Sequence, residues 1–97
     1  MSEKLTAQEF KEIERLVSCA TSAWTKKDAE QHIKRLKFMC GTNGAKLEPY
    51  ARNVFRELIG SVQAASGKVR EKDHWLGVVD QDLYKLIRFA EDGSNHE

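Results

Sequence analysis

The chain has 97 residues, which is enough for one domain with a single modest core and too few for two. Hydrophobic residues make up 40% and charged residues 32%, a balance typical of a folded globular protein and not of a disordered one. The formal net charge is +1, so no overall charge draws the protein to nucleic acid or to an anionic membrane.

The first ten residues, MSEKLTAQEF, have no apolar stretch after their charged residues, so they do not resemble a secretory signal. The apolar runs elsewhere are too short to span a membrane. Cys19 and Cys40 lack CxxC spacing, and no further metal-ligand candidates lie beside them to complete a zinc site. We therefore expect a cytoplasmic protein with two reduced thiols, no metal and no cofactor.

The first predicted helix covers residues 7–24. Thr6 is a suitable N-cap, and Glu9 three residues later completes a capping box. At about 100° per residue the apolar side chains of this segment gather on one face, which is typical of a helix that packs on a core. These side chains are Phe10, Ile13, Leu16, Val17, Ala20, Ala23 and Trp24.

The second predicted helix covers residues 26–40, with Thr25 as its N-cap. Gly41 suits the left-handed position just past a helix C-terminus, so we expect the helix to end before it. The stretch GTNGAK that follows contains two glycines, but no strand precedes it and the spacing of a phosphate-binding loop is missing. These glycines therefore indicate a turn.

The third predicted helix covers residues 49–65, with Pro49 in the first turn, where a missing N–H costs nothing. Its apolar stripe covers nearly half of the helix surface. A stripe of this width suits a central helix with two neighbours, or a helix with one neighbour and an external partner. A homodimer through this helix is therefore expected if the fourth helix leaves the stripe uncovered.

The last segment, DHWLGVVDQDLYKLIRFAEDG, places Asp82 inside the apolar arc if it is drawn as one helix. Restarting the helix with Asp80 as N-cap removes this conflict, because Asp82 then lies in the first turn and is favoured by the helix dipole. We therefore predict a short helical turn near 73–79 and a separate helix over 81–91.

These elements predict an all-α fold, a compact bundle in which sequential helices are mostly antiparallel neighbours. The single domain spans residues 1–97, with loose ends at about 1–5 and 92–97. The predicted core includes Phe10, Trp24, Phe55, Trp75 and Leu86.

The second helix has an apolar face and a basic face. With Ala29 at 0°, the core-facing residues Ile33, Leu36 and Cys40 fall within about 40° of it. Phe38 falls at about 180°, so we expect it to project on the opposite side. The residues nearest to it in angle are Lys27, Gln31, Lys34 and Arg35.

Charge is divided unevenly along the chain. Residues 25–46 hold six basic and two acidic residues, a net charge of +4, whereas residues 71–97 hold three basic and seven acidic residues, a net charge of −4. Two interpretations of Phe38 follow. Either another part of the chain, such as the acidic fourth helix, covers this aromatic side chain, or it anchors a partner whose carboxylates or phosphates meet the surrounding cations.

Two short stretches resemble known families. LKFMCGTNGA, Leu36 to Ala45, resembles the signature of histidine-containing phosphotransfer domains, in which the phosphorylated His precedes Leu-Lys on a bundle helix. Here Lys34 occupies the accepting position, Phe38 replaces a small Gly, and His32 lies about 160° away around the helix. The resemblance therefore implies at most an inactive relative.

The second stretch, GVVDQDLYKLIR, is similar to a segment of the lambda-type phage activators that commit the phage to lysogeny. In that family the segment follows a helix-turn-helix, which the upstream sequence here does not contain. The similarity suggests a phage-borne protein that acts on host machinery, and it assigns no residue a role.

Because no catalytic signature is present, the sequence predicts a small non-enzymatic interaction protein: a regulator, adaptor or inhibitor that works by occupying a surface. The predicted partner-binding residues are Phe38, Lys34, Arg35, Lys27 and Gln31. The alternative is a nucleic-acid-binding module, or a small helical subunit of a nucleoprotein, in which Lys26, Lys27, Lys34 and Arg35 contact phosphates.

Overall fold

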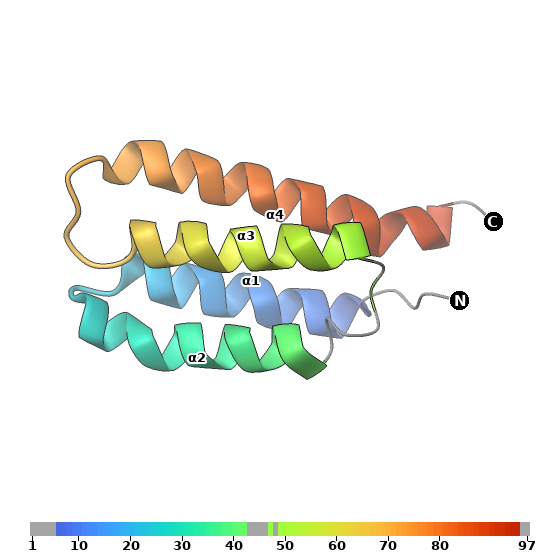
Figure 1. Ribbon diagram of the computed structural model, residues 1–97, viewed down its shortest axis with the longest axis horizontal. Coiled ribbons are helices and arrows are strands. Elements are labelled where there is room, and N and C mark those ends of the chain that lie inside the picture. Colours follow the sequence, from blue (N-terminus) through green and yellow to red (C-terminus); the bar gives the residue numbers. More distant parts are fainter. Residues whose placement is uncertain (1–5, 43–46, 48, 96–97) are drawn as a thin grey trace.

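A computed structural model describes residues 6–42, 47 and 49–95, with side chains as far as Arg88. This part of the chain forms four helices in the order α1 (Ala7–Ser22), α2 (Lys26–Thr42), α3 (Pro49–Ala65) and α4 (Lys72–Asn95). Successive helices run antiparallel, and the connections α1–α2 and α3–α4 lie at the same end of the bundle (Figure 1). The predicted all-α bundle is confirmed.

The helices do not all touch one another. Across the described residues, α3 contacts the other three helices, and α1 does so too, whereas α2 and α4 are not in contact. In Figure 1 α2 and α4 accordingly lie on opposite sides, with α3 between them and α1 behind it. One flank of α2 therefore faces α1, another faces α3, and the remaining surface faces solvent.

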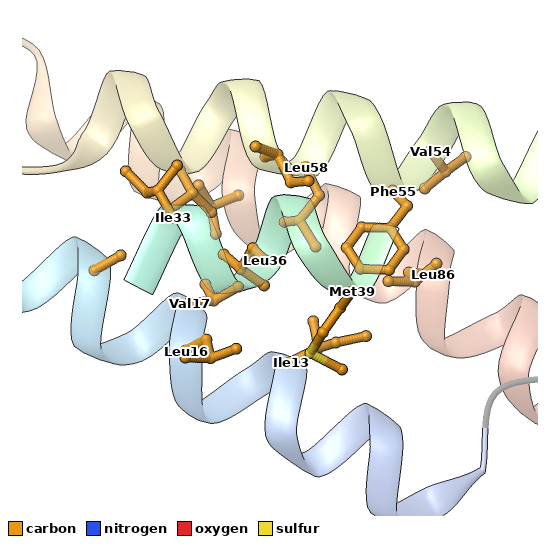
Figure 2. Close-up of a cluster of buried hydrophobic side chains, with 14 of the residues drawn as sticks. Ile13, Leu16, Val17, Ile33, Leu36, Met39, Val54, Phe55, Leu58 and Leu86 are labelled. Atoms are coloured by element: carbon orange, nitrogen blue, oxygen red, sulfur yellow. The ribbon is translucent and has the colours of Figure 1, made fainter. Parts of the chain in front are cut away.

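One cluster of buried side chains holds the bundle together, and all four helices contribute to it. Figure 2 shows the side chains of α1, α2, α3 and α4 converging on the space between the helices. Ile13, Leu36, Phe55, Leu58 and Leu86 are the largest fully buried apolar residues. Three predicted core residues, Phe10, Phe55 and Leu86, are confirmed, and Trp75 is half-buried against the cluster.

The capping box predicted for α1 is present. The backbone N–H of Glu9 donates to Thr6 Oγ1 at 3.1 Å, and the backbone N–H of Thr6 donates to Glu9 Oε1 at 2.8 Å. These bonds satisfy N–H groups that have no partner within the helix. At the start of α2, Asp28 N–H likewise donates to Thr25 Oγ1 at 3.1 Å, as expected for an N-cap.

The helix α1 ends at Ser22, two residues earlier than predicted, and Trp24 is 75% exposed. The prediction that Trp24 lies in the core is therefore wrong. The physical reason is the short connection between α1 and α2. Ala23 adopts an extended backbone conformation and Thr25 caps α2, so Ala23 and Trp24 are needed to reverse the chain direction.

The helix α2 passes through Gly41 and ends at Thr42, so the prediction that Gly41 ends the helix is wrong. The hydroxyl of Thr42 donates to the carbonyl oxygen of Phe38 at 3.0 Å and provides a partner for a carbonyl of the last turn. Gly67 is the glycine with a positive φ, 73°, among the described residues, and it lies in the α3–α4 connection.

The break predicted in the last segment is wrong, because α4 is continuous from Lys72 to Asn95. Asp82 is buried in the arc where the wheel placed it, and it has a partner there. The Ser61 hydroxyl on α3 lies 2.9 Å from Asp82 Oδ2, so a hydrogen bond across the helix pair makes a polar group tolerable in this position.

The apolar stripe of α3 is buried within the bundle from Ala51 to Ala65, mainly against α4, whereas Tyr50 at the start of the helix is 62% exposed. The condition that led us to expect a homodimer, a stripe left open by the fourth helix, is therefore not met in the described part of the chain. The predicted loose ends fall largely outside this part, although the backbone of α4 runs as far as Asn95.

Replacing Gly67 by alanine is expected to lower the free energy of unfolding by about 1–3 kcal/mol, because a Cβ disfavours a positive φ. A Cβ on Gly67 would also lie 2.9 Å from the backbone nitrogen of Lys26. Gly77→Ala in α4 is the matched control, since a Cβ there meets nothing within 4 Å and should stabilise the helix by up to about 1 kcal/mol. Thermal unfolding followed by circular dichroism tests the two variants. Changes in melting temperature that have the same sign in both would contradict the expectation.

Candidate functional site

The outer face of α2, defined here by Lys27, Gln31, Lys34, Arg35 and Phe38, is exposed along its whole length. Periodicity predicted that these five residues share the side of the helix opposite Ile33 and Leu36, and the structure places them there. Phe38 is 57% exposed.

The ring of Phe38 is held by its own helix. The guanidinium carbon of Arg35 lies 5.3 Å from the ring centroid, which is the distance of a cation–π contact between residues three apart on a helix. Such a contact contributes about 0.5–1 kcal/mol at an exposed site. The ring is therefore partly oriented, and its outer side remains accessible.

The acidic fourth helix does not cover Phe38, because α2 and α4 make no contact among the described residues. Figure 1 shows the two helices on opposite sides of the bundle. The interpretation in which α4 shields Phe38 is therefore wrong. The two helices are kept apart by the way the bundle packs. The helix α3 lies between α2 and α4, and α4 pairs with α3 through the Ser61–Asp82 hydrogen bond.

Where α1 faces α2, it carries charges of both signs beside Arg35. Arg15 donates to Glu12 Oε1 and Oε2 at 3.0 and 2.9 Å. This hydrogen-bonded guanidinium lowers the pKa of Glu12, and the more distant Arg35 acts in the same direction. The positive charge of Arg35 is thus partly balanced by α1.

The flank of α2 that faces α3 is different, because it forms a groove of about 550 Å³ with cations on both sides. Lys37 projects from α2, and Arg52 and Arg56 project from successive turns of α3. Among its described lining residues there is no Asp or Glu. We call this feature the α2–α3 groove. Arg52 and Arg56 were not predicted as site residues, although their spacing of four residues places them on one face of α3.

Cys40 lies in the α2–α3 groove and is half-buried. Burial raises the pKa of its thiol, and the positive charges of Arg56 and Arg52 oppose this rise. Both cysteines are free thiols, so no disulfide joins Cys19 to Cys40. The second thiol belongs to α1 and does not line the groove.

Alkylation of Cys40 is expected to be slower in the folded protein than in the urea-unfolded protein at mildly alkaline pH. A raised pKa leaves less thiolate, which is the reacting form, until the pH rises further. Arg56→Gln should slow the reaction again, because it removes a charge that favours the thiolate. Quantitative mass spectrometry of the iodoacetamide-labelled peptide across the pH range tests both expectations. These expectations would be contradicted if labelling reached half of its maximum rate at an equal or lower pH in the folded protein than in the unfolded protein.

Lys26 has a structural role. Its Nζ donates to the carbonyl oxygens of Gln63 and Ser66 at 2.9 and 3.3 Å, at the C-terminus of α3. A cation at this position compensates the unsatisfied carbonyls and the negative end of the helix dipole. The phosphate contact predicted for Lys26 under the nucleic-acid alternative would therefore compete with two existing hydrogen bonds.

Trp24 is another exposed aromatic residue, and its exposure was not predicted from the sequence. It lies at the end of the bundle formed by the α1–α2 and α3–α4 connections, and Lys68 Nζ is 5.4 Å from its ring centroid. The N-cap Thr25 could have indicated the exposure of Trp24. Because the connection is short, the residue directly before this N-cap does not belong to the preceding helix.

The described residues contain no group of three His, Cys, Asp or Glu side chains close enough to hold a metal ion. His32 on α2 is half-buried. Within the same part of the chain, no helix combines the length and the apolar character needed to cross a membrane.

Comparison of the chain with protein-family models, with curated proteins and with solved structures gives no match. Any functional conclusion therefore depends on the geometry of this site.

Proposed function

We propose that this protein is a small non-enzymatic interaction protein that binds a protein partner through the outer face of α2. Phe38 would be the anchor, and Lys27, Lys34 and Arg35 would orient a partner surface that carries carboxylates. The cytoplasm as the site of action remains a prediction from the sequence.

The observation that carries the proposal is the exposure of Phe38 on a cationic face that no other described helix covers. A large apolar side chain at the centre of a charged rim is the arrangement that concentrates binding energy in protein interfaces. The rim contributes mainly to orientation and association rate. The partly oriented ring also loses little conformational freedom on binding, because Arg35 already contacts it.

The direct test places the photo-cross-linking residue benzoylphenylalanine at position 38 and irradiates cells that make the protein. We expect a discrete cross-linked species whose yield falls when Lys34→Glu is added. The matched control places the same residue at position 84, since Tyr84 is 62% exposed on α4 and α4 does not touch α2. The same species at similar yield from both positions would contradict the assignment of the binding face.

Pulldown with the purified protein provides a second measurement. Phe38→Ala should reduce recovery of the cross-linked partner at least tenfold, as expected for an anchor worth more than about 1.4 kcal/mol. Tyr84→Ala should leave recovery unchanged. Full recovery with both Phe38→Ala and Lys34→Glu would show that the site is elsewhere.

The nucleic-acid alternative keeps one supporting observation: Lys37, Arg52 and Arg56 line one groove. Lys34 lies one turn before Lys37 on α2. It predicts binding to random DNA or RNA that weakens steeply as salt concentration rises. Undetectable binding at low salt would remove this alternative. The involvement of Lys26 in capping α3 and the near-neutral net charge make the basic surface less extensive than such modules usually require.

A further inference from the structure

We propose that the α2–α3 groove is a binding site for a short acidic peptide segment of the partner, one that carries at least two carboxylates beside an apolar side chain. This inference rests on the proposed function and adds the chemistry of the partner. It uses residues that lie outside the outer face of α2, namely Lys37, Arg52, Arg56, Ile59 and Gly60.

The charges of the groove define the class of ligand. Three cations line one hollow in which the described lining residues offer no acidic group. Arg52 is anchored, since its Nη2 donates to the carbonyl oxygen of Leu47 at 3.2 Å, and this bond fixes the position of the guanidinium beside the groove. Like charges on the walls of a concave surface reinforce one another and attract an anion. Arg56 also favours a carboxylate geometrically, because a guanidinium can donate two parallel hydrogen bonds to it.

The groove also has an apolar component, which indicates more than a simple anion. Ile59 and the half-buried Cys40 line it together with the cations. Gly41 and Gly60 also line it, and a Cβ added to either would meet nothing within 4 Å. A volume of about 550 Å³ accommodates a few residues, within the range of about 300–1,000 Å³ typical of ligand sites.

An acidic peptide fits these observations better than a nucleic-acid strand. A strand needs a basic track, whereas α1, on the other side of α2, carries Glu12 beside Arg15, and Lys26 is engaged at the end of α3. The basic region is therefore confined to the groove and the adjoining outer face. Phe38 follows Lys37 directly in the chain, so one partner surface can place an apolar pocket over Phe38 and an acidic segment in the groove.

The test uses a blocked hexapeptide of sequence Glu-Glu-Leu-Glu-Glu-Leu, titrated into the ¹⁵N-labelled full chain at low salt. We expect saturable shifts of the amide signals of Gly41, Gly60 and their neighbours. The corresponding peptide with glutamine in place of glutamate should bind at least tenfold more weakly. Raising the salt concentration should weaken the acidic peptide severalfold, because exposed ion pairs are screened.

Two pairs of variants separate charge from shape. Arg52→Gln with Arg56→Gln should weaken binding at least tenfold, whereas Lys85→Gln with Arg88→Gln removes the same charge from α4 and should change it less than twofold. Gly60→Leu fills the hollow and keeps every cation, and it should also weaken binding at least tenfold. Gly77→Leu is its control on α4, because Gly77 has equally open surroundings. Circular dichroism establishes that each variant is folded.

The outcomes are distinct. Shifts confined to residues outside the groove, or equal affinity in the arginine variants and their α4 controls, would overturn the inference. So would a twelve-residue oligothymidylate that shifts the groove amides at lower concentration than the peptide does. If the peptide fails while cross-linking at position 38 succeeds, the groove proposal fails and the proposed function stands. If the peptide binds as expected while cross-linking at position 38 fails, the groove proposal stands and the proposed function fails.

Discussion

Replacing Phe55 by alanine is expected to lower the free energy of unfolding by about 3–5 kcal/mol. The side chain is fully buried in α3, a helix that contacts the other three, so truncation leaves a cavity that several elements line (Figure 2). A chain of this length has a total stability of about 5–15 kcal/mol. The variant should therefore be only marginally folded, as measured by urea denaturation followed by circular dichroism.

The matched control for Phe55→Ala is the same substitution at Phe38. That ring is 57% exposed and makes a single cation–π contact with Arg35, so its loss should cost no more than about 1 kcal/mol. Comparable losses at the two positions would show that Phe38 is covered in solution. This comparison therefore also tests the exposure on which the proposed function depends.

The helices whose ends carry local signals were predictable from the sequence. For α1 and α2 the N-terminal boundary follows from Thr6 and Thr25, which hydrogen-bond to the first turn of their own helices. Pro49 at the start of α3 acts in the same local way. These interactions join residues three or four apart, so the sequence contains all the information that they need.

The errors concern contacts between residues that are distant in the chain. The break proposed at Asp80 followed correctly from the rule that a carboxyl does not belong in an apolar arc. The partner that makes Asp82 acceptable is Ser61, which is 21 residues away, and periodicity does not reveal such a pair. Trp24 was misplaced because its angle fitted the core face of α1, whereas the chain reversal before Thr25 ends the helix first.

The candidate site likewise has one part that the local sequence predicts and another that depends on contacts between helices. The outward direction of Phe38 is a property of one helix, and a wheel predicts it. The groove depends on which turn of α3 lies beside Lys37 and Cys40, which is a property of the packed pair. The basic residues of α2 were recognised from local charge and from their angles on one helix, but Arg52 and Arg56 gain significance only when the two helices are placed together.

Ser61→Ala is expected to lower the free energy of unfolding by about 1.5–3 kcal/mol, the usual contribution of a hydrogen bond to a carboxylate, with added cost where the group stays buried. Asp82 is buried, and the Ser61 hydroxyl is the partner that the structure gives its Oδ2 at 2.9 Å. Truncating the serine leaves this carboxyl inside the bundle without that bond. The loss should be measurable by chemical denaturation.

Replacing Asp82 should cost much less stability than replacing Ser61. This difference between the two partners is the more specific prediction. The Ser61 hydroxyl also lies 3.0 Å from the carbonyl oxygen of Glu57, so it retains an acceptor when Asp82 is replaced by leucine. Removing a buried carboxyl in favour of an apolar side chain is often neutral or stabilising. We therefore expect Asp82→Leu to change stability by less than about 1 kcal/mol in either direction.

The double variant Ser61→Ala with Asp82→Leu completes the cycle and isolates the coupling between the two side chains. If the cost of Ser61→Ala arises from the abandoned carboxyl, it should largely disappear in the background of Asp82→Leu, because no polar group is then left unpaired by the truncation. Additive effects would mean that the two side chains act independently. The continuity of α4 through Asp82 would then need a cause other than this hydrogen bond, such as the apolar packing of Val79 and Leu86 on either side of it.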